Sequence, residues 1–337
     1  MINYRQNRIN NPKEINFEYI DSELRDGKDV IVQFSDLTFS DAILSQLDKL
    51  CDKYDSNFGV RFYGNYSGSF DFKTLLKIPH VKYLSVDCMI NAHNILVISE
   101  LQYLKKLSLG VFELKETEIL NLSNLKKLKE LILTDTKTKA LNLDYLRDYK
   151  NLKLLIICGH TKNIDAVGEI VGLEFLSLNS VKRVSISFVN KLINLKTLKL
   201  ILGSRNNINE IDENKIENLE IVWVRGFNDL SCISNFKNLK NFLIEDNIQL
   251  ESIKFDIEFP FLESLKILNC KKLNYINGIN NLKVLKQIII SKTDVNFNSF
   301  INQNLPTSLS YVGFYTTKSK VDKEIKNKLV ELGYKTR

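Results

Sequence analysis

The sequence has few of the residues that interrupt regular structure: its 337 residues include 13 glycines and 4 prolines. Because the loops of ordinary globular domains are rich in both, we expect this chain to join its elements by short, similar turns. Long hydrophobic runs are also missing, since none approaches the roughly 18 apolar residues that span a bilayer. Residues 1–19 contain no apolar stretch of signal-peptide length. These absences predict a soluble, cytoplasmic protein that does not enter a membrane.

Residues that carry catalysis or bind metals are scarce as well. The three histidines, His80, His93 and His160, are far apart in the sequence, so no acid, base and nucleophile are clustered. The five cysteines are an odd number at wide spacings and include no C-x-x-C pair, which argues against a zinc site or a disulfide framework. No glycine-rich phosphate-binding loop occurs either. We therefore expect a protein that is not an enzyme and that has no cofactor and no metal.

What the sequence does contain is one hydrophobic pattern, L-x-x-L-x-L with other apolar residues replacing some leucines. Eleven copies occur, at Val81-Leu84-Val86, Leu104-Leu107-Leu109, Leu128-Leu131-Leu133, Leu152-Leu155-Ile157, Leu173-Leu176-Leu178, Leu195-Leu198-Leu200, Leu219-Val222-Val224, Leu239-Phe242-Ile244, Leu262-Leu265-Ile267, Leu285-Ile288-Ile290 and Leu309-Val312-Phe314. Successive copies begin 20 to 24 residues apart, inside the period of leucine-rich repeats. The alternation predicts a short strand in each copy, with its fourth and sixth positions inward and its third, fifth and seventh outward.

A single copy of this pattern cannot bury its own apolar face, so the copies should stack on one another. Stacking pairs each strand with the next one along the chain and produces a parallel sheet over one continuous core. The rest of each repeat should return over the other side in helical or 3₁₀ turns. We therefore predict an α/β fold, a leucine-rich-repeat solenoid or horseshoe with a parallel concave β-sheet and capped ends.

The repeats resemble those of bacterial leucine-rich-repeat proteins of the internalin-like kind, in a cytoplasmic form, over residues 58–317. The resemblance implies the solenoid fold but no particular partner, because such solenoids serve many partners. In the family, the ninth position of a repeat usually holds a buried Asn or Cys, and only Asn247 and Cys270 fit that pattern here. Because the other repeats depart from the family at this position, we expect an irregular corner where the repeats turn over.

The ends of a solenoid need caps, because open ends would expose core and strand edge. Near the N-terminus, Val30, Val32 and Phe34 alternate as in a strand, and Ser40 can cap a following helix. Near the C-terminus, Ser319 is placed to cap another helix. We therefore expect a cap of strand and helix over 1–57, repeats over 58–317 and a capping helix over 318–337.

Apolar residues at outward positions have no reason in the core and point to a partner-binding surface. The outward apolar residues of the predicted strands are Ile132, Leu154, Ile156, Phe175, Ile201, Ile221, Trp223 and Leu243. A second set of candidates lies just past the strands, where the repeats turn over: Arg205, Arg225, Phe227, Glu245 and Asp246. The alternative is that aliphatic side chains simply suit a parallel sheet and that a few exposed ones are normal.

The function that these features favour is a non-catalytic, monomeric solenoid that captures a protein partner on its concave face and rim. By analogy, one such role is that of an immunity protein that neutralises a toxin domain. An alternative is a single-stranded nucleic-acid-binding protein, suggested by the net charge of +7 and by outward aromatic residues. Nucleic acid is the less favoured partner, because the outward columns carry almost as many acidic as basic residues: Lys106, Lys199, Lys266 and Arg225 against Asp87, Glu130 and Glu245. A scaffold that binds several partners weakly is the third possibility.

Overall fold

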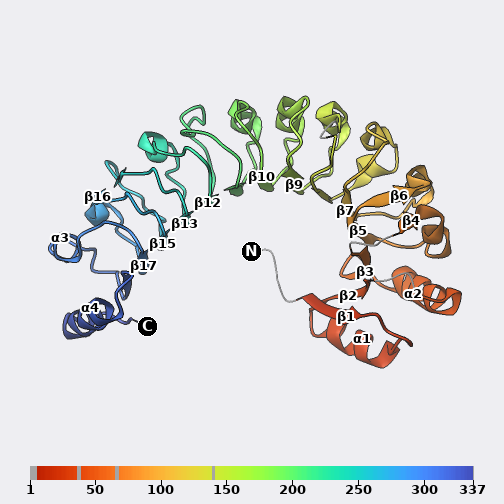
Figure 1. The fold of residues 1–337 in the computed structure, drawn as a ribbon, viewed down its shortest axis with the longest axis horizontal. Coiled ribbons are helices and arrows are strands. Elements are labelled where there is room, and N and C mark those ends of the chain that lie inside the picture. Colours follow the sequence, from red (N-terminus) through yellow and green to blue (C-terminus); the bar gives the residue numbers. More distant parts are fainter. Residues whose placement is uncertain (1–5, 36–38, 65–67, 139–140, 337) are drawn as a thin grey trace. The chain divides into compact units, whose positions relative to one another are not determined.

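The computed structural model describes residues 6–35, 39–64, 68–138 and 141–336. Two compact units divide the chain, residues 1–172 and residues 173–337. Within each unit the long sheet lies along one side and the helical segments lie along the other (Figure 1). No helix in the described part of the chain is both long and apolar enough to cross a membrane.

The sheet of the N-terminal unit consists of parallel strands that pair in the order in which they occur in the chain. They are β1 (Gln6–Asn10), β2 (Asp29–Phe34), β3 (Phe58–Tyr63), β5 (Tyr83–Met89), β7 (Lys106–Val111), β8 (Glu130–Leu133) and β9 (Leu154–Cys158). The remaining elements of this unit are α1 (Phe17–Arg25), α2 (Asp41–Lys53), the paired strands β4 (Ser69–Asp71) and β6 (Asn91–His93), and the 3₁₀ helices η1 (Phe72–Lys77), η2 (Ile95–Glu100), η3 (Ile119–Asn121), η4 (Leu125–Lys127), η5 (Leu143–Asp148) and η6 (Ile164–Glu169).

The C-terminal unit repeats this arrangement with its own parallel strands. They are β10 (Phe175–Asn179), β11 (Thr197–Ile201), β12 (Asn218–Val222), β13 (Asn241–Glu245), β15 (Ser264–Leu268), β17 (Gln287–Ser291) and β18 (Tyr311–Tyr315). Its other elements are η7 (Ser187–Lys191), η8 (Ser231–Asn235), the paired strands β14 (Ser252–Lys254) and β16 (Tyr275–Asn277), η9 (Ile279–Asn281), α3 (Phe297–Ile301) and α4 (Ser319–Glu331). The predicted α/β solenoid of stacked repeats is confirmed.

The inward positions of the repeat pattern form the core. In ten of the eleven copies, all three apolar residues of the predicted motif are buried. One copy is placed wrongly: Leu198 pairs with Leu219 and Leu200 pairs with Ile221, so the motif of β12 is Ile216-Leu219-Ile221. The motif predicted for this repeat starts at Leu219, three residues too late. Because side chains alternate along a strand, that odd shift exchanges its inward and outward residues.

The ends of the chain agree in part with the predicted caps. The Ser40 hydroxyl accepts a hydrogen bond from the N–H of Ile43 at 3.3 Å, so the predicted start of α2 is confirmed. The prediction that Ser319 caps α4 is wrong, because Ser319 is the first residue of the helix. The turn before this helix is held instead by the Thr316 hydroxyl, which accepts from the Lys318 N–H at 3.0 Å.

Both β1 and α1 were missed by the sequence analysis. The strand β1 has the mostly polar sequence QNRIN, which shows no apolar alternation, yet it pairs residue by residue with β2. The helix α1 begins after Asn16, whose side chain accepts a hydrogen bond from the N–H of Tyr19 at 3.0 Å.

At the ninth position, Asn247 behaves as the resemblance implied. Its buried amide group donates to the carbonyls of Ile221 and Glu245, both at 2.8 Å, and its carbonyl accepts from the N–H of Val224 at 3.2 Å. One asparagine therefore satisfies several backbone groups at the corner of the repeat. The buried Cys270 follows it, with its Sγ 3.5 Å from the Leu268 carbonyl.

Candidate functional site

Each sheet has one face turned toward the core and one turned away from it, which we call the open face. On the open face of the C-terminal unit, side chains align in columns because the strands pair without any shift in register. The column nearest the strand ends contains Ile201, Val222, Glu245 and Leu268 on neighbouring strands. Neighbours in such a column are about 4.8 Å apart. This column is therefore mainly apolar, with one carboxylate inside it.

Most of the predicted apolar surface residues lie on an open face and are half-buried. In the N-terminal unit these are Ile132, Leu154 and Ile156, of which Ile132 and Ile156 are direct neighbours on β8 and β9. In the C-terminal unit, Phe175, Ile201 and Leu243 lie on the open face of their strands and are half-buried. Each unit therefore presents its own apolar side chains on its open face.

Three predicted site residues are buried, and their expected accessibility is wrong. Ile221 is fully buried because it holds the sixth position of its repeat, as the register of β12 requires. Phe227 is also fully buried, where the chain starts its return after the strand. The guanidinium of Arg205 binds the Glu210 carboxylate and the Val184 carbonyl, both at 3.2 Å.

Burial lowers the pKa of Arg205, and the Glu210 carboxylate opposes that effect. The hydrogen bonds of Arg205 fix the long segment between β11 and β12, so its role is structural. Arg225, in contrast, is exposed as expected.

The C-terminal unit has a row of residues just past its strands, all in the left-handed backbone conformation. This row, which we call the rim, consists of Ser180, Leu202, Trp223, Asp246, Asn269 and Lys292, with φ between 51° and 60°. The N–H of each rim residue donates to the carbonyl of the last strand residue in the next repeat, at 2.7–3.0 Å. The rim therefore continues the hydrogen-bond ladder of the sheet one residue beyond the strands.

Two rim residues combine this conformation with a large, exposed apolar side chain. Asn and Asp tolerate positive φ because their short side chains can hydrogen-bond locally, whereas bulky residues there are genuine outliers. Leu202 and Trp223 are such outliers, and their side chains are 40% and 63% exposed. Trp223 lies one residue past the end of β12, whereas the sequence pattern predicted that it lies on the strand. Since no core contact requires large side chains at these exposed positions, they mark this part of the rim as a candidate site.

Glu245 and Asp246 bring negative charge to the part of the rim that contains Leu202 and Trp223. Burial raises the pKa of Glu245, and the carboxylates of Asp246 and Glu220 add to the increase. Glu245 forms no ion pair with any residue that the structure describes, whereas Glu220 binds Lys199 at 2.9 Å. The carboxylate of Asp246 accepts a hydrogen bond from the amide of Asn269.

The open face of the N-terminal unit is more polar. Arg61 forms an ion pair with Asp87 at 2.6 Å and lies over the ring of Tyr63, 4.2 Å from its centroid. The Ser85 hydroxyl also donates to Asp87, at 2.5 Å. These side chains satisfy one another, so they hold the surface of β3 and β5 in place without needing a ligand.

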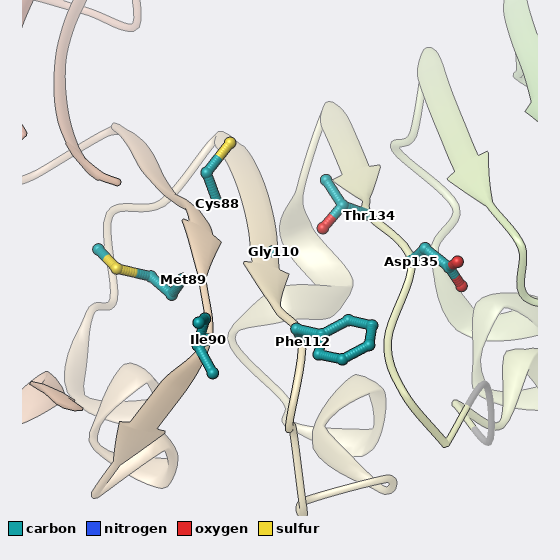
Figure 2. Close-up of a pocket in the computed structure, with 7 residues that line it drawn as sticks. All are labelled: Cys88, Met89, Ile90, Gly110, Phe112, Thr134 and Asp135. Atoms are coloured by element: carbon teal, nitrogen blue, oxygen red, sulfur yellow. The ribbon is translucent and has the colours of Figure 1, made fainter. Parts of the chain in front are cut away.

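A pocket of about 390 Å³ lies at the ends of β5 and β7 in the same unit. Figure 2 shows its lining, in which the Phe112 ring extends from the end of β7 toward the segment that follows β8. The repeat pattern does not reveal this pocket, because Ile90 and Phe112 lie outside the motif. Cys88 also lines the pocket, and desolvation together with the Asp87 carboxylate raises the pKa of its thiol, so less of it is present as the reactive thiolate. In the described part of the chain no group of three or more potential ligands could hold a metal ion.

Comparison with solved structures identifies similar folds. An internalin (inlF) from Listeria monocytogenes is 15% identical, with a TM-score of 0.54, over 93% of this chain and 87% of that one. A leucine-rich-repeat protein from Leptospira interrogans is 14% identical, with a TM-score of 0.46, over 97% of this chain and 93% of that one. No family model and no curated relative matches the sequence. The chain therefore has a leucine-rich-repeat fold of the kind seen in bacterial internalins.

Proposed function

We propose that this chain is a non-catalytic solenoid that binds a protein partner through the open face and rim of its C-terminal unit. The observation that carries the proposal is the pair Leu202 and Trp223, two large apolar side chains that are exposed at strained backbone positions. Strain of this kind costs about 1–3 kcal/mol per residue and is concentrated at functional sites. Tryptophan is also among the residues that contribute most to binding energy at protein interfaces.

The surroundings of this pair suit a protein better than a nucleic acid. On the neighbouring strands, Lys199 is neutralised by Glu220, and Glu245 adds a carboxylate that would repel phosphates. Ile201 and Val222 give the site an apolar floor. An apolar centre with charges around it is the usual composition of a protein interface.

A preformed surface loses little conformational entropy on binding, which suits tight one-to-one capture. Neutralisation of a toxin domain by a monomeric, cytoplasmic, bacterial immunity protein is the role that we favour within this class. It rests on analogy with other binding solenoids and not on a motif.

Affinity capture with the full chain tests the proposal. Wild type, a Leu202→Gly/Trp223→Gly double variant and an Ile193→Ala control would each be used to capture proteins from cells of the source organism. Ile193 is 64% exposed in the turn between η7 and β11, so it matches Trp223 in exposure. We expect one protein in stoichiometric amount with wild type and control, and its loss with the double variant. Equal recovery with all three forms would refute the proposed site.

A further inference from the structure

We propose that the site around Trp223 recognises an arginine side chain of the protein partner. This inference rests on the proposed function and names the chemistry of the partner at that site. The site consists of Ile201, Leu202, Val222, Trp223 and Glu245, which we call the tryptophan patch.

Backbone pairing makes the tryptophan patch contiguous. Ile201 pairs with Val222, and Val222 pairs with Glu245, so these three side chains are neighbours on the open face. Leu202 donates its N–H to the Val222 carbonyl and Trp223 donates its N–H to the Glu245 carbonyl, both at 2.8 Å. The two exposed rim side chains therefore start directly beside the column that contains the carboxylate.

The carboxylate of Glu245 is the polar group that this patch leaves unmatched. It lies between Val222 and Leu268 in its column and forms no ion pair with the residues that the structure describes. Its pKa is raised by burial and by neighbouring acids, and no basic side chain is among the causes. Lys199, the basic residue on β11, is bound to Glu220 instead.

A partner that covers the tryptophan patch removes the Glu245 carboxylate from water and must supply a group that pairs with it. A purely apolar side chain would bury Glu245 without a partner, which is strongly unfavourable. An acidic side chain would be repelled by Glu245 and Asp246. A basic side chain satisfies the carboxylate, and its alkyl stem can pack against Ile201 and Val222.

The indole of Trp223 favours arginine over lysine. A guanidinium stacks on the face of tryptophan and can bond a carboxylate through two parallel N–H groups. An ammonium group is a more strongly hydrated point charge and loses more on leaving water. The patch, in which a residue with an exposed indole bonds the backbone of a residue with an unpaired carboxylate, has the groups that arginine recognition requires.

The test uses intrinsic fluorescence, because Trp223 is the only tryptophan of the chain. The full chain would be titrated with acetyl-Leu-Arg-Leu-amide and with two analogues in which citrulline or glutamate replaces the arginine. A single anchored side chain should bind in about the millimolar range, so titration would extend to about 10 mM. We expect a saturable change in Trp223 emission with the arginine peptide, at a Kd at least about ten-fold lower than with citrulline.

Two variants make the test specific. Glu245→Gln should reduce the preference for arginine over citrulline to less than about three-fold, which corresponds to loss of most of the charge contribution. The control Glu258→Gln removes an exposed carboxylate between β14 and β15 and should keep the full preference. Equal binding of arginine and citrulline, tighter binding of glutamate, or no saturable change overturns the inference.

The inference and the proposed function can fail separately. If capture of the partner depends on Leu202 and Trp223 but the peptides show no preference for arginine, the binding site stands and the arginine inference falls. If capture is unaffected by the rim variants, the proposed site falls. If capture does depend on the rim variants, a preference for arginine in wild type that Glu245→Gln removes supports the inference.

Discussion

The six rim residues of the C-terminal unit share a backbone conformation that most side chains adopt poorly. Each of their N–H groups donates to a carbonyl of the next repeat, and each has a positive φ. Asp and Asn, as at Asp246 and Asn269, adopt this conformation readily. At Leu202 and Trp223 the left-handed backbone lowers the stability of the fold by about 1–2 kcal/mol each. Stability alone would favour Asn or Gly at these places. A residue that costs stability and faces solvent is better explained by what it binds.

Replacing Trp223 by glycine should separate stability from binding. Glycine removes the left-handed strain, but it raises the conformational entropy of the unfolded chain, which lowers stability by about 0.4–1 kcal/mol. We therefore expect the free energy of unfolding of Trp223→Gly, measured in urea, to be unchanged or higher by up to about 1 kcal/mol. Trp223→Ala retains its Cβ and should be less stable than Trp223→Gly. A loss of more than about 2 kcal/mol in the glycine variant would show that the indole is part of the core.

Gly203, which follows the rim residue Leu202, should respond to substitution in the opposite way. Its φ is +79°, and a Cβ there would overlap the carbonyl oxygen of Val181 in the preceding repeat. Because backbone cannot move aside as a flexible side chain can, Gly203→Ala should lower the free energy of unfolding by about 2 kcal/mol or more. Gly172→Ala is the control, since its nearest non-neighbouring atom would be 3.6 Å from the added Cβ. Similar stability of the two variants would contradict this account of Gly203.

At the scale of elements, β12 shows how far a hydrophobic pattern determines a strand. Residues 216–224 contain apolar side chains in two possible registers, and the register predicted from the sequence is the wrong one. The spacings could have revealed the error: the chosen register gives intervals of 24 and 20 residues, whereas Ile216 gives 21 and 23. The other ten motifs were placed in the observed register, and their burial was predicted correctly.

The candidate site was less predictable than the fold for a related reason. Sequence periodicity places Trp223 near the surface, but backbone φ depends on the hydrogen bond that its N–H forms with the next repeat. The burial of Arg205 and Phe227 likewise depends on how the long return segments fold, where no periodic pattern applies. The importance of Leu202 was missed because it lies outside the strand columns.

The register of β12 can be tested directly with two neighbouring residues. Ile221 is fully buried and Val222 is half-buried on the open face. Ile221→Ala should cost about 2–5 kcal/mol of unfolding free energy, whereas Val222→Ala should cost less than about 1.5 kcal/mol. Chemical denaturation of both variants measures the difference. The reverse order of costs would restore the register in which Val222 points inward.

The contact between α2 and the segment before β5 should depend on pH. The ring of His80 bonds the Asp48 carboxylate at 2.9 Å, and this bond raises the pKa of His80 above 6.5. A raised histidine pKa stabilises the fold at low pH, and the contribution is lost as pH rises through the folded-state pKa. The melting temperature of wild type should therefore exceed that of His80→Gln by more at about pH 5.5 than at about pH 8. A difference that does not change with pH would mean that the bond contributes nothing through its charge.

At the scale of the whole molecule, a solenoid must seal the sheet and core at its ends. At the C-terminal end, Lys335 pairs with Tyr311: its N–H donates to Ser310 and its carbonyl accepts from Val312, at 2.9 and 3.0 Å. The edge of β18 is thereby partly paired. The helix α4 packs next to it, with Ile325 and Leu329 buried. Together they protect backbone and apolar side chains that would otherwise bind a second molecule.

Two adjacent residues of α4 test this account of the cap. Leu329 is fully buried, whereas Val330 is 57% exposed, so the same substitution should have different effects at the two positions. In Leu329→Asp, a buried charge would detach the helix and open the end of the sheet, and light scattering coupled to size exclusion should detect self-association. Val330→Asp places its charge in water and should elute as wild type does. If both variants remain in the wild-type state, α4 is not needed to protect the β18 edge, and the pairing of Lys335 with Tyr311 is sufficient.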